Sequence, residues 1–120
     1  MAHDRRKSEE AGRTAELIAL WYLRLKGWRL IAYRYKSPVG EVDLVMRRGK
    51  VTAFIEVKAR SSLDGAVEAV SPRQARRIAA AARHFLAARS QAEQTCRFDI
   101  VAVSPYHWPR HIENAFEGDQ

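Results

Sequence analysis

Apolar residues recur at helical spacing in the first part of the chain. The positions that fall on one face are Ala11, Ala15, Ile18, Tyr22 and Leu25. Their alternating steps of four and three residues predict a helix over residues 9–26, which a glycine ends. Leu17, Leu20 and Trp21 widen the apolar stripe. Glu16 is therefore expected close to buried surface.

Three stretches rich in aromatic and β-branched residues follow, and they predict strands over 28–35, 41–47 and 51–60. The turn residues KSPVG separate the first strand from the second. Between the second and the third, the pair Arg48-Gly49 predicts a tight hairpin turn, because glycine readily takes the positive φ that such turns need. Residues 61–70 predict a loop with room for a short irregular strand.

A second helix is indicated by its start signals. Ser71 is a capping residue, Pro72 suits the first helical position, and Gln74 completes a capping box. The helix is expected to run to Arg89. Its apolar face is formed by Ala75, Ile78, Ala79, Ala82, Phe85 and Leu86. Residues 96–104 then predict a further strand.

The order helix, three strands, helix, strand predicts an α/β fold with a mixed β-sheet flanked by helices. The last strand follows a helical crossover and is expected to lie parallel to a neighbour. With 120 residues, the chain is expected to form a single domain over 1–120. Residues 1–8 and the polar segment 105–120 are expected to be flexible, with one short element at IENAF, residues 112–116.

The charge of the chain favours an anionic partner. A net charge of +7 and a pI near 10.1 indicate nucleic acid ahead of a membrane surface, because no basic amphipathic anchor is evident. Cys96 is the only cysteine, which excludes an intrachain disulfide. The sequence shows neither a secretory signal nor an apolar run of membrane-spanning length, so a cytoplasmic location without a membrane partner is expected.

The predicted hairpin gathers charged residues in an apolar run. With its turn at the glycine named above, Asp43 opposes Phe54, and Glu41 opposes Glu56. Side chains alternate between the faces of a strand, so Asp43, Glu56 and Lys58 share a face. The commoner explanation of such a pattern is the solvated face of an amphipathic hairpin. The alternative is a group of carboxylates that holds a cation.

The alternative predicts a particular chemistry. Two or three carboxylates around one point suit a hard divalent metal such as Mg²⁺, which takes oxygen ligands and keeps waters. Phosphodiester hydrolysis needs such a metal, an activated water, and positive charge where the transition state builds negative charge. In this interpretation Asp43 and Glu56 hold the metal, and Lys58 orients the water or contacts the phosphate.

The same residues carry a resemblance to a known family. GEVDLV, a hairpin and then FIEVKAR resemble the acid and acid-x-lysine core of the PD-(D/E)XK nuclease superfamily, which includes type II restriction enzymes and archaeal Holliday junction resolvases. Most of the chain is similar to the YraN family of small bacterial endonuclease-like proteins. The matching segments are GRTAELIALWYLRLKGWRLI, GEVDLV, FIEVKARSS, SPRQARRI, RFDIVAV and IENAF.

The resemblance implies a restriction-endonuclease-like fold and a nuclease that depends on Mg²⁺ or Mn²⁺. Its expected substrate is nucleic acid, DNA before RNA, with branched DNA as one candidate and a homodimer as one assembly. By this similarity Asp43 is the central metal-binding acid, and Glu56 and the carbonyl of Val57 complete the metal site. Lys58 corresponds to the catalytic lysine, and Glu16 to the first-helix acid near the metal. The alternative is a non-catalytic nucleic-acid-binding module on the same fold.

Basic side chains near these motifs are candidate nucleic-acid contacts. They are Arg34, Lys36, Arg60, Arg73, Arg76 and Arg77. The three on the second helix fit a solvated helix face equally well. Arg34 departs from the family, where an asparagine is expected.

Three polar residues of the last segment carry no predicted chemistry. The spacing of His107, His111 and Glu113 is weak support for a transition-metal site, and they are expected to be mobile or at the surface. Asp99 is expected to pair with Arg97.

Overall fold

A computed structural model of the chain describes residues 2–60, 65–89 and 95–116. These residues form two helices and five strands. In chain order they are α1 (Ala2–Leu25), β1 (Arg29–Ser37), β2 (Gly40–Arg48), β3 (Val51–Ala59), α2 (Pro72–Arg89), β4 (Thr95–Val103) and β5 (Arg110–Ile112). The predicted α/β class and the order of its first six elements are confirmed.

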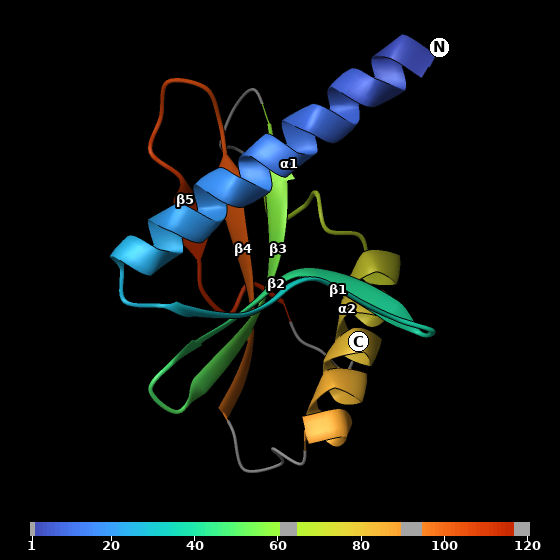
Figure 1. Cartoon of the computed structure of the whole chain (residues 1–120), viewed down its shortest axis with the longest axis vertical. Helices are drawn as coiled ribbons and strands as arrows, with labels where there is room; N and C mark the ends of the chain where they lie inside the picture. Colours follow the sequence, from blue (N-terminus) through green and yellow to red (C-terminus); the bar gives the residue numbers. More distant parts are fainter. Residues whose placement is uncertain (1, 61–64, 90–94, 117–120) are drawn as a thin grey trace.

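The five strands form one mixed sheet in the order β1-β2-β3-β4-β5 (Figure 1). β3 and β4 are parallel, as predicted for a strand that follows a helical crossover, and the other neighbours are antiparallel. The crossover through α2 returns the chain to the end of the sheet at which β3 begins, so that β4 can run parallel to β3. The sheet is therefore centred on β3, the strand that carries the acid-x-lysine motif.

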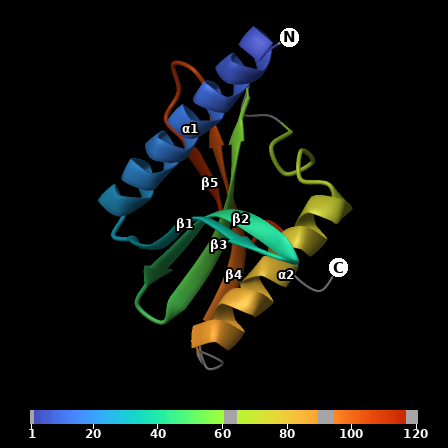
Figure 2. The same cartoon turned by 45° about the vertical axis from the view of Figure 1, so that its right-hand side comes forward.

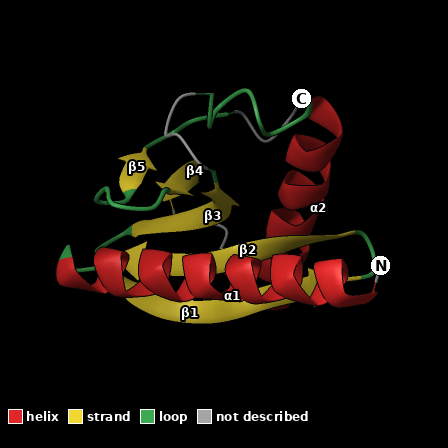
Figure 3. Cartoon of the chain, turned by 90° about the horizontal axis from the view of Figure 1, so that it is seen from above, coloured by secondary structure: helices red, strands yellow, loops and turns green. Residues whose placement is uncertain are grey.

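The two helices cover opposite faces of the sheet (Figure 2). Viewed from above, α1 runs across the sheet on one side, and α2 stands behind its far end (Figure 3). Of the helices in the described part of the chain, neither combines the length and the apolar character needed to cross a membrane.

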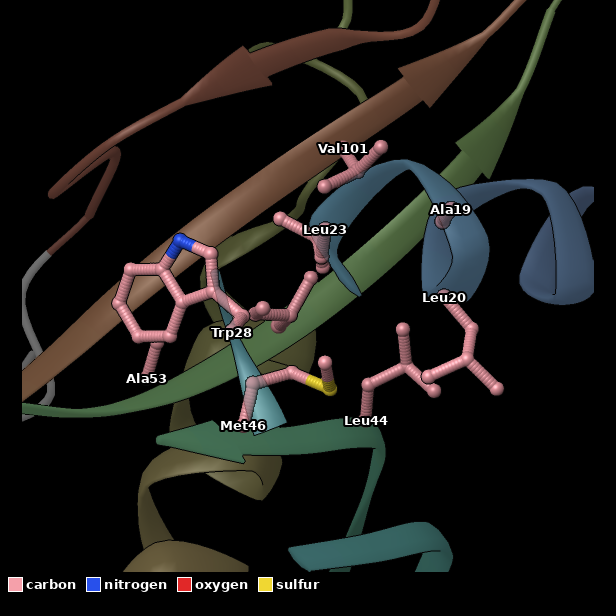
Figure 4. Close-up of a cluster of buried hydrophobic side chains, with 9 residues drawn as sticks. Ala19, Leu20, Leu23, Trp28, Leu44, Met46, Ala53 and Val101 are labelled. Atoms are coloured by element: carbon pink, nitrogen blue, oxygen red, sulfur yellow. The ribbon is translucent and has the colours of Figure 1, made fainter. Parts of the chain in front are cut away.

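The core beneath α1 contains the largest buried cluster. Ala19, Leu20 and Leu23 of the helix lie on Leu44 and Met46 of β2 (Figure 4). The other members of the cluster are Trp28, Ala53, Ile55 and Val101. Ala15 of the predicted helix face is buried, but Ile18 and Leu25 are exposed, as are Leu17 and Trp21. The buried face is thus rotated from the predicted one, and Trp21, which was predicted to widen the apolar stripe, is 59% exposed.

The core beneath α2 agrees with the sequence pattern. The buried residues of the helix are Ala75, Ile78, Ala79, Ala81, Ala82 and Phe85. The ring of Phe85 packs edge-on against Phe54 of β3, with centroids 5.8 Å apart. Val45 of β2 is fully buried in the same cluster. Both faces of the hairpin are therefore covered, and the face that carries the acidic residues is not a solvated one.

Two end segments differ from their predictions. α1 begins at Ala2, seven residues before the predicted start at residue 9. The short last element is β5, Arg110–Ile112, which pairs with β4, rather than residues 112–116. Residues 61–64 of the predicted loop and the final residues 117–120 lie outside the described residues.

A close contact joins the β1–β2 hairpin to α2. A Cβ added to Gly40 would overlap the backbone carbonyl of Arg77, so only glycine fits at this position. The contact brings the start of β2 against the second turn of α2. The acidic residues of β2 are thereby held beside the N-terminal end of this helix.

Candidate functional site

The register of the β2–β3 hairpin differs from the prediction by two residues. Arg48 pairs with Val51, so the loop residues are Gly49 and Lys50. Glycine at the first loop position, with φ of 61°, is typical of a type II′ turn, whereas the prediction placed it second. A loop with a single glycine can place it at either the first or the second position, so the sequence alone does not decide between the two turns. A shift of two keeps the alternation of side chains, so the predicted faces hold.

The corrected register brings Asp43 and Glu56 closer than predicted. The last registered pair of the hairpin is Leu44 with Ile55. Asp43 and Glu56 are the next residues along the two strands, and their side chains are hydrogen-bonded to each other, whereas the prediction set Asp43 across from Phe54. The predicted opposition of Glu41 and Glu56 is therefore wrong.

The side chain of Asp43, rather than the backbone of β2, accepts the next hydrogen bond from β3. The backbone N–H of Val57 donates to Oδ2 of Asp43 at 2.8 Å. The N–H and C=O of one strand residue point to the same neighbouring strand. The Val57 carbonyl is therefore expected to point toward the side of β3 on which Asp43 lies.

Burial is the largest cause that raises the pKa values of the two carboxyls. Loss of hydration is the largest cause for Glu56, and the neighbouring Asp43 charge and hydrogen bond add to it, so the pKa of Glu56 is raised to about 8. Burial also raises the pKa of Asp43, against the hydrogen bonds that it accepts from Glu56 and Val57. The pair therefore shares a proton near neutral pH, with Glu56 as the donor.

Lys58 lies against Glu56 on the same face. Its Nζ is 3.4 Å from Oε2 of Glu56, and both side chains are nearly buried, at 11% and 12% exposed. Lys58 Nζ also donates to Oε1 of Gln74 at 3.2 Å, and Gln74 Nε2 donates to Glu56 Oε2 at 3.4 Å. Gln74 thus bridges the lysine and the acid.

Gln74 is a site residue that the sequence interpretation missed. It was assigned only to the capping box, which the structure confirms: its N–H donates to Ser71 Oγ at 3.1 Å, and its Oε1 accepts from the Ser71 N–H at 3.3 Å. The first turn of a helix that follows the acid-x-lysine strand was the available signal, since this turn packs beside that strand.

Glu16 reaches the same area from α1 but is held by other side chains. Its Oε1 accepts from Arg34 Nε at 2.7 Å and from the Tyr33 hydroxyl at 3.0 Å. Glu16 and Asp43 line one pocket of about 210 Å³. Glu16 is therefore near Asp43, as predicted, with its charge compensated by Arg34.

Arg34 has an unusual backbone conformation. Its φ is 52°, in the left-handed region where asparagine is strongly enriched among residues other than glycine. This conformation gives a physical reason for the asparagine expected there in the family. The nearby Asp43 contributes to the raised pKa of Arg34, although the hydrogen bond to Glu16 is the larger cause.

The other candidate nucleic-acid contacts fall into two groups. Lys36 lines the pocket of Glu16 and Asp43, and Arg77 lines a second pocket, of about 80 Å³, with Asp43, Glu56 and Gln74. These two cations are at the site. Arg73 and Arg76 are exposed on α2 and line neither pocket, and Arg60 lines an apolar pocket beside α1. The structure does not bring these three to the acidic pair.

The donor set at the site fits a hard divalent cation. Among the described residues, no three His, Cys, Asp or Glu side chains form a group that could hold a metal ion. The oxygen donors available are the carboxyls of Asp43 and Glu56 and the carbonyl of Val57. Mg²⁺ is commonly bound through one or two carboxylates while it keeps several waters, so this set suits it.

A separate polar cluster lies at the other side of the sheet. Asp99 is fully buried and accepts from Arg97, from His111 Nε2 at 2.7 Å and from the Asn114 N–H at 2.9 Å. Burial opposes its ionisation, but these hydrogen bonds outweigh it and lower the pKa of Asp99. The Arg97 pair is confirmed. The surface position expected for His111 is wrong, because only 1% of its side chain is exposed.

Together the fold and these side chains define an α/β protein with a buried acidic pair and a lysine on the neighbouring strands β2 and β3. The chain belongs to the uncharacterised protein family UPF0102, whose family model matches residues 15–103. This is the YraN family, to which the sequence motifs are similar. The matched region includes all the residues of the acidic site.

Several bacterial relatives span most of the chain. A UPF0102 protein of Parvibaculum lavamentivorans is 49% identical over 106 residues, which cover 88% of this chain and 80% of the relative. A UPF0102 protein of Chelativorans sp. is 46% identical over 113 residues, which cover 93% and 91%. A UPF0102 protein of Bradyrhizobium diazoefficiens is 50% identical over 107 residues, which cover 88% and 80%. Their names state a family and no activity.

Proposed function

We propose that this protein is a metal-dependent endonuclease that binds nucleic acid, DNA before RNA, and hydrolyses phosphodiester bonds. The observation that carries the proposal is the buried pair of Asp43 and Glu56, with the ammonium of Lys58 in an ion pair with Glu56. Burial raises the pKa of both acids, and a structural role alone gives no reason to bury them together. A nucleic-acid substrate also suits the cytoplasmic location that the sequence predicts.

The metal of the proposal is Mg²⁺ or Mn²⁺. The carboxyls of Asp43 and Glu56 and the carbonyl of Val57 would hold it. A divalent ion bound there would supply Lewis acidity to the phosphate and lower the pKa of a bound water. Glu56 must give up its proton for this role, because a metal ligand binds in its deprotonated form.

The remaining work falls to cationic and positioning residues of the chain. Lys58 Nζ supplies positive charge where the pentacovalent phosphate builds up negative charge, or orients the attacking water. Gln74 is a positioning residue that fixes the Lys58 ammonium beside Glu56. Lys36 and Arg77 line the two pockets on either side of Asp43. They hold the phosphates that flank the bond to be cut.

The proposal is tested with labelled single-stranded, duplex, flap and four-way-junction DNA and with RNA, in Mg²⁺ or Mn²⁺. Wild type is compared with Asp43→Asn and with Glu68→Gln, an exposed acid outside both pockets. We expect metal-dependent cleavage of at least one substrate, retained in Glu68→Gln and abolished in Asp43→Asn. Equal cleavage by wild type and Asp43→Asn would contradict the proposal.

A second candidate function is a nucleic-acid-binding module without catalysis. One observation favours it: the carboxylate of Glu16 is engaged by Arg34 and Tyr33 rather than directed to Asp43. Binding that weakens steeply with salt, without cleavage of any substrate in either metal, would support this candidate over the nuclease.

A further inference from the structure

Two arginines lie directly opposite each other at the end of the sheet far from Gly40. Arg29 of β1 is the registered partner of Arg47 of β2. Side chains of directly opposite residues are close neighbours on one face, and like charges in such a pair destabilise the sheet. An anion between the two guanidinium groups would remove this repulsion.

The same arginines line a concave surface. A pocket of about 490 Å³ is bounded by Gly27, Arg29, Arg47, Arg48 and Gly49, and is named here the arginine pocket. Its residues come from the α1–β1 turn, the start of β1, the end of β2 and the β2–β3 turn. Figure 1 shows these two turns at the same side of the molecule. Arg48 is held in place, since it lies 4.6 Å over the Trp28 ring and donates to the Lys26 carbonyl at 3.2 Å.

The positive charge of this pocket is not compensated by neighbouring acids. Within the parts of the chain whose side chains are described, the ion pairs involve Arg34, Lys58, Arg97 and His111. None of them includes an arginine of the pocket. Arg97, which also lies over Trp28, differs because Asp99 neutralises it. The arginine pocket is thus a concentrated cationic site with room for an anion.

We propose that the arginine pocket binds a phosphodiester group of the same nucleic-acid strand that is cut at Asp43. This inference rests on the proposed function and adds a second contact point to it. Asp43 and Arg47 are four residues apart on β2 and share a face by alternation, which separates them by about 14 Å at about 3.4 Å per residue. Phosphates of one duplex strand advance about 3.4 Å along the helix axis while they also wind around it, so a straight distance of about 14 Å corresponds to a phosphate about two nucleotides from the cut.

The test is binding of a labelled DNA duplex of about 20 base pairs, measured by fluorescence anisotropy in EDTA, where cleavage does not interfere. Wild type is compared with Arg29→Gln/Arg47→Gln across a range of salt concentrations. The matched control is Arg83→Gln/Arg110→Gln, which removes the same charge from exposed positions outside the arginine pocket. Arg29→Lys/Arg47→Lys keeps the charge. Inorganic phosphate serves as the small-anion probe in a parallel thermal-shift titration.

The salt dependence of binding gives the expected result. Its logarithmic slope should fall by about 1 if both arginines hold one phosphate, and by about 2 if each holds its own, since each neutralised phosphate contributes about 0.9. The lysine variant and the control should keep the wild-type slope.

Each other outcome overturns the inference in a recognisable way. An unchanged slope in Arg29→Gln/Arg47→Gln, or an equal fall in the control, shows that nucleic acid does not use the pocket, while cleavage by wild type still supports the proposed function. Stabilisation by inorganic phosphate that needs Arg29 and Arg47, with an unchanged DNA slope, reassigns the pocket to a small anion. Failure of wild type to bind DNA at all removes the proposed function together with this inference.

Discussion

The backbone N–H of Val57 donates a hydrogen bond of 2.8 Å to the side-chain carboxylate of Asp43. In a regular hairpin this donor would pair with the backbone of β2, but the registered pairs end at Leu44 and Ile55. The side chain of Asp43 therefore substitutes for backbone at the point where the strands separate. The separation makes room for a second carboxyl, that of Glu56, beside the first.

Stability in the absence of metal should decrease as the pH rises. The pKa of Glu56 is raised from 4.5 to about 8 by burial and by Asp43. Between these values the folded chain binds a proton that the unfolded chain has released, so the stabilisation is complete below about pH 4.5 and lost through about pH 8. Thermal unfolding in EDTA from pH 5 to pH 9 measures this decrease.

Replacing Glu56 isolates that effect. Glu56→Gln keeps the hydrogen bond to Asp43 without a titratable group, so it should be more stable than wild type at pH 9, by about 1–3 kcal/mol or about 4–12 °C. The advantage should shrink toward pH 5. The exposed Glu68→Gln is the control, and an identical pH profile for Glu56→Gln and wild type would contradict the assigned cause.

Metal binding should release a proton and stabilise the fold. Mg²⁺ or Mn²⁺ requires Glu56 in its ionised form, so titration calorimetry at pH 7 in buffers of different ionisation enthalpy should show about one proton released per ion. Metal that binds only the folded chain should also raise the free energy of unfolding, by about 2.7 kcal/mol at a hundredfold excess over Kd. The Tm should rise accordingly. Asp43→Asn should abolish both effects. A Tm rise that persists in Asp43→Asn would place the metal elsewhere.

Gln74 and Ser71 separate helix capping from site geometry. Either alanine substitution breaks the capping box and should lower stability by about 1 kcal/mol. Only Gln74→Ala also removes the hydrogen bonds to Lys58 and Glu56, so it alone should lower cleavage, by about 10-fold to 100-fold. Unfolding curves and initial rates measure the two effects. Equal rates for Ser71→Ala and Gln74→Ala would argue against a positioning role.

Gly40 sets the contact between the hairpin and α2. A Cβ there meets the Arg77 carbonyl, so Gly40→Ala should destabilise the fold by about 2–3 kcal/mol through overpacking. Gly12 in α1 is the control, because nothing lies within 4 Å of a Cβ placed there. Gly12→Ala should stabilise the helix by up to about 1 kcal/mol. Denaturant unfolding of both variants tests the contrast.

The sequence predicted elements best where two signals agreed. For α2, the capping box at Ser71 and Gln74 and the periodic apolar face gave the same helix, and the structure confirms both. For α1, apolar residues occur almost all round the helix, so periodicity alone did not decide between the face of Ile18 and that of Leu23. β5 has three residues, too few for a period to be recognised.

The site was predicted by face but not by register. Alternation gave Asp43, Glu56 and Lys58 one face regardless of where the turn lay. The turn itself depended on whether Gly49 takes the first or the second loop position, which a single glycine leaves open. Gln74 and the burial of His111 depend on packing between distant segments, and local pattern does not contain such contacts.

The most direct test of the central claim is the rate of phosphodiester cleavage by Lys58→Ala in saturating Mg²⁺, measured against wild type and the exposed Arg83→Ala. The Lys58 ammonium lies 3.4 Å from Glu56. In the proposed mechanism it stabilises charge that forms only during the reaction, so its loss should lower the rate at least about 100-fold. Arg83→Ala should keep the wild-type rate. A Lys58→Ala variant that is folded and as fast as wild type would contradict the account.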